Sequence, residues 1–136
     1  MTRGRKPQNI VQGTSTVTIG KPPSWLSKDA KAEWKRVAPI LNERMTITEG
    51  DLATLESYCT AIGTVREMQR LINRDGSIIA TEKGPKRHPA LGVQNASITT
   101  ARLCATELGL TPVSRSRPSI RDNNKDNDDD NPLNVS

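Results

Sequence analysis

After position 88 the hydrophobic residues recur at helical spacing, which predicts a helix over about residues 90–108. Pro89 suits a first helical position, where a missing N–H has no partner to lose, and Gly109 can take the left-handed conformation that ends a helix. One face is apolar: Leu91, Ile98, Ala101, Ala105 and Leu108. A looser second apolar face is formed by Val93, Ala96, Leu103 and Cys104. A helix apolar over most of its circumference is normally covered by several neighbours.

Two earlier segments also have a helical period. In the first, the apolar residues at helical spacing are Ala30, Trp34, Val37 and Leu41. They predict a helix that begins after Ser27, which is its expected N-cap. Pro39 should kink or end this helix because it lacks a backbone donor. A longer helix is expected over about 49–74, after Thr48 and Asp51, which resemble a capping box. The two helices, joined at 45–48, could form a helix-turn-helix DNA-binding unit or only a packing pair.

Residues 77–87 have a different character. Ser-Ile-Ile-Ala-Thr is strand-like, and the following Glu-Lys-Gly-Pro favours a turn. A small β-hairpin or an extended arm fits this segment, with a basic tip. His88 has no catalytic partner visible in the sequence, so we expect it to play a structural role beside the next helix. The predicted fold is therefore mainly α, with a short helix before two long ones and a small β-hairpin or extended arm.

The ends of the chain look unable to fold alone. Residues 1–21 have no hydrophobic period and form a flexible basic arm, and residues 114–136 form a disordered tail that is basic and then acidic. The folded body, expected over 22–113, has little from which to build a core, since the chain contains no Phe, one Tyr and two Trp. A body of this size is close to the limit at which one core suffices, and oligomerisation often helps.

The net charge of +5 conceals an asymmetry. Residues 1–121 carry 19 Lys and Arg against 10 Asp and Glu, which gives +9, whereas residues 122–136 carry one Lys against five Asp, which gives −4. A basic body suggests a polyanion as partner. The acidic tail either binds something else or competes for the basic surface.

The residue types needed for catalysis or cofactor binding do not occur in a workable pattern. Cys59 and Cys104 lack metal-ligand spacing and are expected to be reduced core thiols. The segment 13–21 does not match a phosphate-binding loop, since its glycines are too far apart and Lys21 is followed by Pro22. We therefore expect no enzyme activity, no cofactor and no metal. No apolar run approaches the ~18 residues that a membrane span needs.

Several short motifs, spread over about residues 3–117, together resemble one class of phage terminase small subunits. They are Gly-Arg-Lys-Pro at 4–7, Pro-Pro-Ser-Trp-Leu at 22–26, Ala-Lys-Ala-Glu-Trp at 30–34 with Pro39, Thr48 and Asp51 with Leu52, Leu55 and Tyr58, Gly76, His88-Pro89, Glu-Leu-Gly-Leu-Thr-Pro at 107–112 and Ser114-Arg115. Each is short, and it is their joint order that is specific.

The resemblance implies a non-enzymatic packaging factor in the cytoplasm of an infected bacterium, not carried in the mature virion. Such a small subunit binds the packaging initiation site on concatemeric viral DNA. It also recruits and regulates a large subunit that carries the ATPase and nuclease. The resemblance also implies a mainly helical fold with a hairpin of two long antiparallel helices. Members of the class form rings, here expected to contain about 8–12 subunits.

Charge and resemblance together assign residues to three contacts. Double-stranded DNA is expected to contact Arg3, Arg5, Lys6, Lys28, Lys31, Lys35, Arg36, Lys83, Lys86, Arg87, Arg115 and Arg117. Val93, Ala96 and Leu103 are expected to meet an adjacent subunit. The terminase large subunit is expected to contact the acidic tail at Asp128, Asp129, Asp130, Asn131, Pro132 and Leu133.

Two other functions fit the residues. A small helix-turn-helix regulator would form a dimer on a palindromic site and bind tightly without a second protein. A structural adaptor would use the acidic tail and never contact nucleic acid. The mass of the assembly and the salt dependence of DNA binding distinguish these alternatives from a packaging ring.

Overall fold

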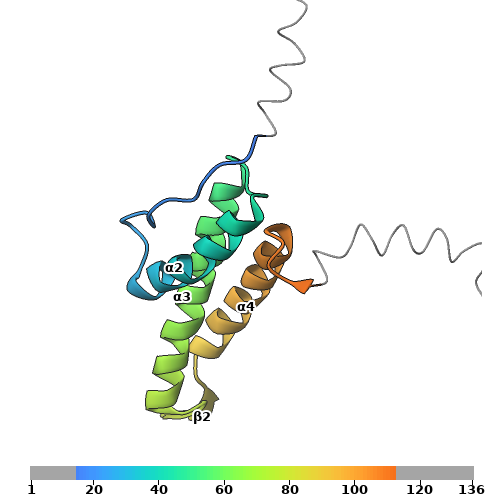
Figure 1. The fold of residues 1–136 in the computed structure, drawn as a ribbon. Helices are drawn as coiled ribbons and strands as arrows, with labels where there is room; N and C mark the ends of the chain where they lie inside the picture. Colours follow the sequence, from blue (N-terminus) through green and yellow to red (C-terminus); the bar gives the residue numbers. More distant parts are fainter. Residues whose placement is uncertain (1–14, 113–136) are drawn as a thin grey trace, which may run out of the picture.

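The computed structural model describes residues 15–112, which form three helices and one small antiparallel sheet. The helices are α2 (Lys28–Arg44), α3 (Asp51–Asp75) and α4 (Ala90–Glu107), and the strands are β1 (Ile78–Thr81) and β2 (Gly84–Arg87). Figure 1 shows α3 and α4 side by side, joined at one end by the strands, while α2 packs against the first half of α3. The mainly helical fold and the small β-hairpin predicted from the sequence are confirmed.

Helix α2 begins as predicted but does not end where Pro39 suggested. The Ser27 hydroxyl accepts a hydrogen bond from the Ala30 N–H at 3.2 Å, which caps the first turn. The helix runs on past Pro39 to Arg44 and closes at Met45, which has a left-handed φ of 55°. The prediction that Pro39 ends the helix is therefore wrong. Pro39 lies on the exposed side, and burial of its neighbours on the other side outweighs one missing hydrogen bond.

The largest fully buried side chains lie on α2 and α3. Val37, Leu41, Leu55 and Cys59 are fully buried there. Gly63 marks the closest approach, since a β-carbon at this position would lie 2.9 Å from the Ser27 hydroxyl oxygen and 3.0 Å from the Ala30 backbone nitrogen. The absence of a side chain at residue 63 is what allows the two helices to approach this closely.

Residues 15–21, which the sequence places in a flexible arm, lie against α2 and the loop before α3. Val17 donates its N–H to the Ile47 carbonyl at 2.8 Å. The Asn42 side chain exchanges two hydrogen bonds with the backbone of Ile19, whose own side chain is buried. The Trp34 indole N–H donates to the Gly20 carbonyl at 2.9 Å. The folded body therefore includes these seven residues.

The start of α3 shows half of the expected capping box. The Asp51 carboxylate accepts hydrogen bonds from the Thr48 N–H at 2.9 Å and from the Thr48 hydroxyl at 3.1 Å. The Thr48 hydroxyl thus bonds the carboxylate and not a free N–H of the helix, and Gly50 occupies the cap position without a side-chain bond. Of the two side-chain bonds of a capping box, only the one that Asp51 accepts from the Thr48 N–H is formed, and a backbone bond from the Asp51 N–H to the Thr48 carbonyl at 3.0 Å holds the same turn.

A two-residue turn at Glu82 and Lys83 closes the β-hairpin, with Ile78 paired to Arg87 at its open end. His88 fastens this open end between the two long helices. Its Nδ1 accepts the Ala90 N–H at 3.0 Å, which leaves Nε2 to donate to the Asp75 carboxylate at 2.9 Å. His88 thus has the structural role beside α4 that we expected.

Helix α4 ends in the predicted glycine motif. The Gly109 N–H donates to the Thr106 carbonyl and the Leu110 N–H to the Ala105 carbonyl, with Gly109 at a φ of 74°. These two bonds form a Schellman motif, which a glycine in the left-handed region makes possible. The Arg44 guanidinium donates to the Gly109 carbonyl at 2.6 Å and ties this end to α2.

Candidate nucleic-acid interface

The first predicted basic cluster lies on α2. Lys28, Lys31 and Lys35 recur at spacings of three and four residues, so they follow one face of the helix. Lys28 and Lys35 are exposed, and Lys31 is half-buried. Within residues 15–112 none of the three forms an ion pair, so their charges are available to an external anion.

The second basic cluster lies on the β-hairpin. Lys83 is in the turn and Lys86 and Arg87 are on β2, and all three side chains are exposed. None is ion-paired with a residue that the structure describes. Figure 1 shows the hairpin at the end of α3 that lies away from the start of that helix.

These two clusters are separated along the molecule. The start of α2 packs against Gly63 of α3. The hairpin follows the end of α3 at Asp75, which is twelve residues further along that helix. At 1.5 Å per residue this separation is roughly 18 Å along the α3 axis. An extended polyanion, and not a single small anion, has the length to contact both.

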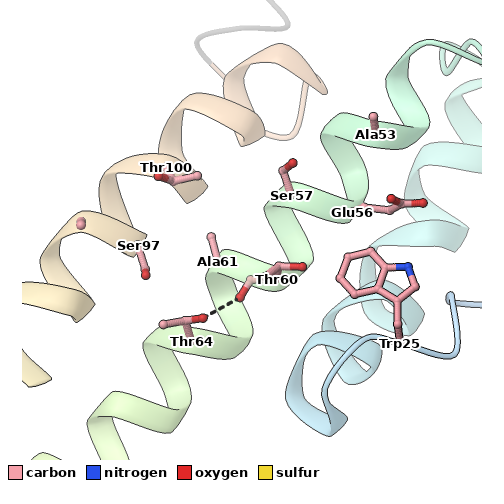
Figure 2. Close-up of a pocket in the computed structure, with 10 residues that line it drawn as sticks. Trp25, Ala53, Glu56, Ser57, Thr60, Ala61, Thr64, Ser97 and Thr100 are labelled. Carbon is pink, nitrogen blue, oxygen red and sulfur yellow. Dashed lines mark hydrogen bonds between the residues drawn. The ribbon is translucent and has the colours of Figure 1, made fainter.

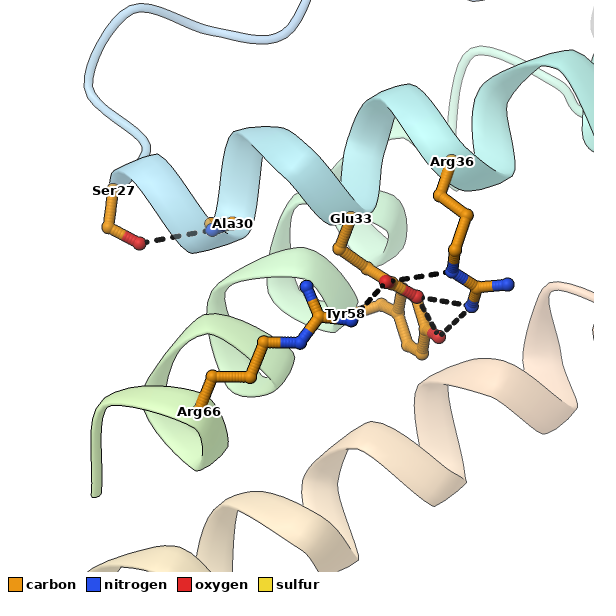
Figure 3. Close-up of polar contacts among 6 residues, drawn as sticks. All are labelled: Ser27, Ala30, Glu33, Arg36, Tyr58 and Arg66. Carbon is orange, nitrogen blue, oxygen red and sulfur yellow. Dashed lines mark hydrogen bonds and ion pairs between the residues drawn. The ribbon is translucent and has the colours of Figure 1, made fainter. Parts of the chain in front are cut away.

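Arg36, also predicted to contact DNA, has a partner within the chain that the sequence did not reveal. Figure 3 shows its guanidinium, that of Arg66 and the Tyr58 hydroxyl converging on the carboxylate of Glu33. Arg36 Nε lies 2.9 Å from Glu33 Oε1, Arg66 Nη2 lies 3.0 Å from the same oxygen, and the Tyr58 hydroxyl donates to Oε2 at 2.6 Å. Glu33 is 1% exposed. The single negative charge of Glu33 is therefore shared between Arg36 and Arg66, and the cluster keeps one net positive charge.

The charges of this cluster shift the pKa values in opposite directions. Burial by itself raises the pKa of Glu33, but hydrogen bonds from Arg36 and Tyr58 and the charge of Arg66 outweigh it, so the pKa lies below its usual range. Burial, followed by the hydrogen bond to Glu33, raises the pKa of Tyr58 to about 12. Glu33 is therefore a carboxylate, and Tyr58 a neutral donor, at neutral pH.

Two further arginines of α3 are similarly engaged within the chain. Arg70 pairs with Asp29 of α2, and Arg74 bonds the carboxylate of its neighbour Asp75. The Arg74 hydrogen bond, followed by that of His88, holds the pKa of Asp75 well below its usual range. Arg66 and Arg70 thus join α3 to α2, whereas the lysines of the two basic clusters are left unpaired within residues 15–112. The sequence shows only that both residue types are frequent.

Several predicted contact residues lie outside the described residues. They are the basic residues Arg3, Arg5, Lys6, Arg115 and Arg117, and the tail residues Asp128, Asp129, Asp130, Asn131, Pro132 and Leu133. Their assignments stay predictions.

The three residues predicted to meet another subunit lie on the outer surface of α4. Val93 is 48% and Leu103 is 63% exposed, and Ala96 is also exposed. The face expected to pack on α3 differs from expectation in two positions. Gln94 is buried, donating from Nε2 to Gln69 and to the Val65 carbonyl, whereas Ile98 is 39% exposed. Ile98 lies at the edge of the contact with α3, not at its centre.

Residues 15–112 contain no group of acidic, histidine or cysteine side chains placed to hold a metal ion. In that part of the chain there is also no helix both long enough and apolar enough to span a membrane.

The geometry is that of a small helical protein with unpaired cations at two separate places among the described residues and exposed apolar residues on α4. A family model described as phage terminase, small subunit, matches residues 30–125. The chain belongs to this family, whose members act in viral genome packaging and are generally the non-catalytic subunit of the terminase. The match covers both strands, α3, α4 and nearly all of α2. Comparison with curated proteins and with solved structures gives no match.

Proposed function

We propose that this chain is the DNA-binding and regulatory subunit of a terminase, working in the cytoplasm of the infected host. It binds the packaging initiation site on concatemeric double-stranded viral DNA and recruits and regulates the large ATPase and nuclease subunit. The observation that carries this proposal is the family match, together with six cations on α2 and the hairpin that have no acidic partner within residues 15–112.

DNA binding would rest mainly on phosphate contacts. Each phosphate that a Lys or Arg neutralises releases condensed counterions, so affinity falls with salt in proportion to the number of contacts. The separation of the two clusters suits a duplex, whose phosphates continue over that length. Base contacts would be needed for recognition of one site, and these basic side chains supply mainly position and affinity.

Duplex affinity measured over a range of salt concentrations tests this assignment. Replacing Lys28, Lys31 and Lys35 with Gln should weaken binding and reduce the slope of log K against log salt by about 0.9 for each phosphate that the variant no longer neutralises. The same change at Lys83, Lys86 and Arg87 should act similarly. Arg70→Gln with Arg74→Gln is the control, because their charges are already offset by Asp29 and Asp75. Unchanged affinity and slope in both triple variants would contradict the assignment.

Recruitment of the large subunit is assigned to the acidic tail, Asp128–Asp130 with Asn131, Pro132 and Leu133. A chain ending at residue 121 should keep its DNA affinity and lose binding to the large subunit in a pull-down assay. If the shortened chain instead binds DNA much more tightly and still binds the large subunit, the tail acts on the basic surface and not on the partner.

The assembly we propose is a ring of about 8–12 copies, in which weak DNA contacts are repeated and act together. Val93, Ala96 and Leu103 would lie between subunits. Leu103→Glu or Ala96→Glu should yield smaller species by native mass spectrometry while the circular dichroism of the helices stays unchanged. A wild-type dimer would instead favour a helix-turn-helix regulator. An intact ring in both variants would remove these residues from the interface.

A further inference from the structure

The α3–α4 hairpin has two different apolar flanks. The first, which we name the tryptophan flank, is a groove of about 540 Å³. Figure 2 shows its floor of small side chains from both helices, bordered by Trp25. Trp25 is 64% exposed although it is the largest apolar side chain here, and exposed aromatic residues are typical of protein interfaces. Its main residues are Trp25, Glu56, Thr60, Thr64, Ala96 and Thr100.

The second, the isoleucine flank, is a smaller hollow of about 230 Å³. It is lined by Tyr58, Ile62, Val65, Ile98, Arg102 and Ala105. A cavity of roughly 150 Å³ holds a benzene ring, so this hollow has room for a bulky side chain of a partner. Ile98 is exposed at its edge because α3 covers only the centre of the α4 face.

These flanks lie on opposite sides of the line along which α3 and α4 meet. They share no residue. At about 100° per residue, Thr60 and Ile62 point roughly 200° apart around α3, as do Thr100 and Arg102 around α4. A contact that buries one flank therefore leaves the other free.

Each flank has one charged residue, and the two charges are of opposite sign. Glu56 lies on the tryptophan flank beside Trp25, and Arg102 lies on the isoleucine flank. Neither side chain forms a hydrogen bond or ion pair with a residue in the described part of the chain, unlike Glu33 and the arginines around it. Two apolar surfaces with one unpaired charge each, of opposite sign, are complementary to one another.

We infer that the tryptophan flank of one subunit docks on the isoleucine flank of the next, with Glu56 facing Arg102 across the contact. The occupant of each flank is thus a second copy of this chain. Because the two surfaces differ, the contact is heterologous, and the subunit at each end of an open assembly keeps one unused flank until the assembly closes. The small side chains of Thr60, Thr64 and Ala96 let a helix of the neighbour approach closely. This inference rests on the proposed ring and specifies its interface.

Charge exchange tests the pairing. Glu56→Arg places two positive charges in the contact, and Arg102→Glu places two negative ones, so each variant should dissociate at a protein concentration at least tenfold higher than the wild type, measured by mass photometry and light scattering. The double variant Glu56→Arg/Arg102→Glu should restore assembly. An equimolar mixture of the two single variants should also assemble, in alternation, because each then offers the charge that the other lacks.

The control is Glu43→Arg, which makes the same charge change at an exposed position of α2 outside both flanks. Assembly of this variant should match the wild type, and circular dichroism should show that all variants are folded. A wild-type chain that stays monomeric contradicts the proposed ring and this inference with it. A wild-type ring that both single variants also form, or single variants that dissociate without rescue in the double variant, overturns this interface and leaves the ring standing.

Discussion

The two helix contacts of this molecule are built differently. Between α2 and α3, large apolar residues are fully buried, a glycine permits close approach, and the buried carboxylate of Glu33 receives three donors. Between α3 and α4, the buried residues are mostly small, with Ala61, Ala90 and Ala101 among them, and large side chains such as Leu103 stay exposed. The first contact is complete within one chain. The second leaves large apolar side chains of α4 exposed.

This difference explains how a chain with few large apolar residues can be folded and still expose apolar side chains on α4. The bulky core residues are concentrated where α2 crosses α3, and they fix the arrangement of these two helices. Helix α4 is held to the other helices by small buried side chains, by the buried Gln94, and by the bond between Arg44 and Gly109 at its end. Variants in the first contact should therefore affect stability, and variants on α4 should affect assembly.

Removing the Glu33 carboxylate should produce the largest loss of stability. Glu33→Ala leaves Arg36, Arg66 and Tyr58 without their acceptor, and breaking a buried ion pair typically costs about 3–5 kcal/mol. Because both arginines are about half exposed, with side-chain exposures of 59% and 43%, we expect a loss of about 3 kcal/mol in urea unfolding. Asp29→Ala, which breaks the more exposed pair with Arg70, should cost much less.

The pH dependence of stability provides a second test of the same cluster. The pKa of Glu33 is lower in the folded chain than the ordinary glutamate value of 4.5, so its contribution is fully present above that value and is lost as pH falls through the folded pKa. Wild type should therefore lose more stability below pH 4.5 than Glu33→Gln does. Equal loss in both would show that other carboxylates govern acid unfolding.

Adding one methyl group at the α2–α3 crossing should have an intermediate effect. Gly63→Ala brings a β-carbon against the Ala30 backbone, which cannot move aside easily, and overpacking of this kind costs about 1–3 kcal/mol. Gly92→Ala is the matched control, because nothing lies within 4 Å of a β-carbon there and the residue is inside α4. Its higher helix propensity should stabilise the chain by up to about 1 kcal/mol. If both glycines respond alike, α2 and α3 are packed less tightly than the β-carbon distances at Gly63 imply.

The smallest effect is expected in thiol labelling, which leaves the fold intact. Cys59 lies in the α2–α3 contact with no exposure, and burial raises its pKa to about 12, so little reactive thiolate forms. Cys104 on α4 is only partly buried. In the native protein a thiol reagent should modify Cys104 well before Cys59, and urea should abolish the difference. Faster labelling of Cys59 would contradict the comparison between the two contacts.

Much of the fold could be predicted from the sequence because the signals are local. Hydrophobic period marks all three helices of residues 15–112, Ser27 and Gly109 mark ends that depend on neighbouring backbone groups, and the turn at residues 82–83 follows from the residues around it. The end of α2 could not be predicted from Pro39, because the effect of a proline in a helix depends on how strongly the other side of that helix is packed. Residues 15–21 have no period, so their attachment to α2 could not be seen.

For the predicted DNA contacts, too, one part could be predicted from the sequence and another part could not. The sequence identified the cations of this chain, and the family that it resembles is confirmed by the family match. Composition could not distinguish Arg36, which faces a buried carboxylate, from Lys35, its neighbour, which has no acidic partner within residues 15–112. Nothing in the sequence distinguishes Glu33 from the other acidic residues, because its partners Tyr58 and Arg66 lie on α3 and come close to it only in the folded chain.

The sequence by itself determined the elements, their order and the family, since these follow from periodicity, capping residues and short motifs that neighbouring positions encode. Only the tertiary structure decided which charges are offset and which apolar faces of α4 stay uncovered. Both depend on distances between residues far apart in the chain, such as Glu33 with Arg66 and Arg44 with Gly109. Those distances are set by how closely the helices pack, and the small residues at their contacts set that packing.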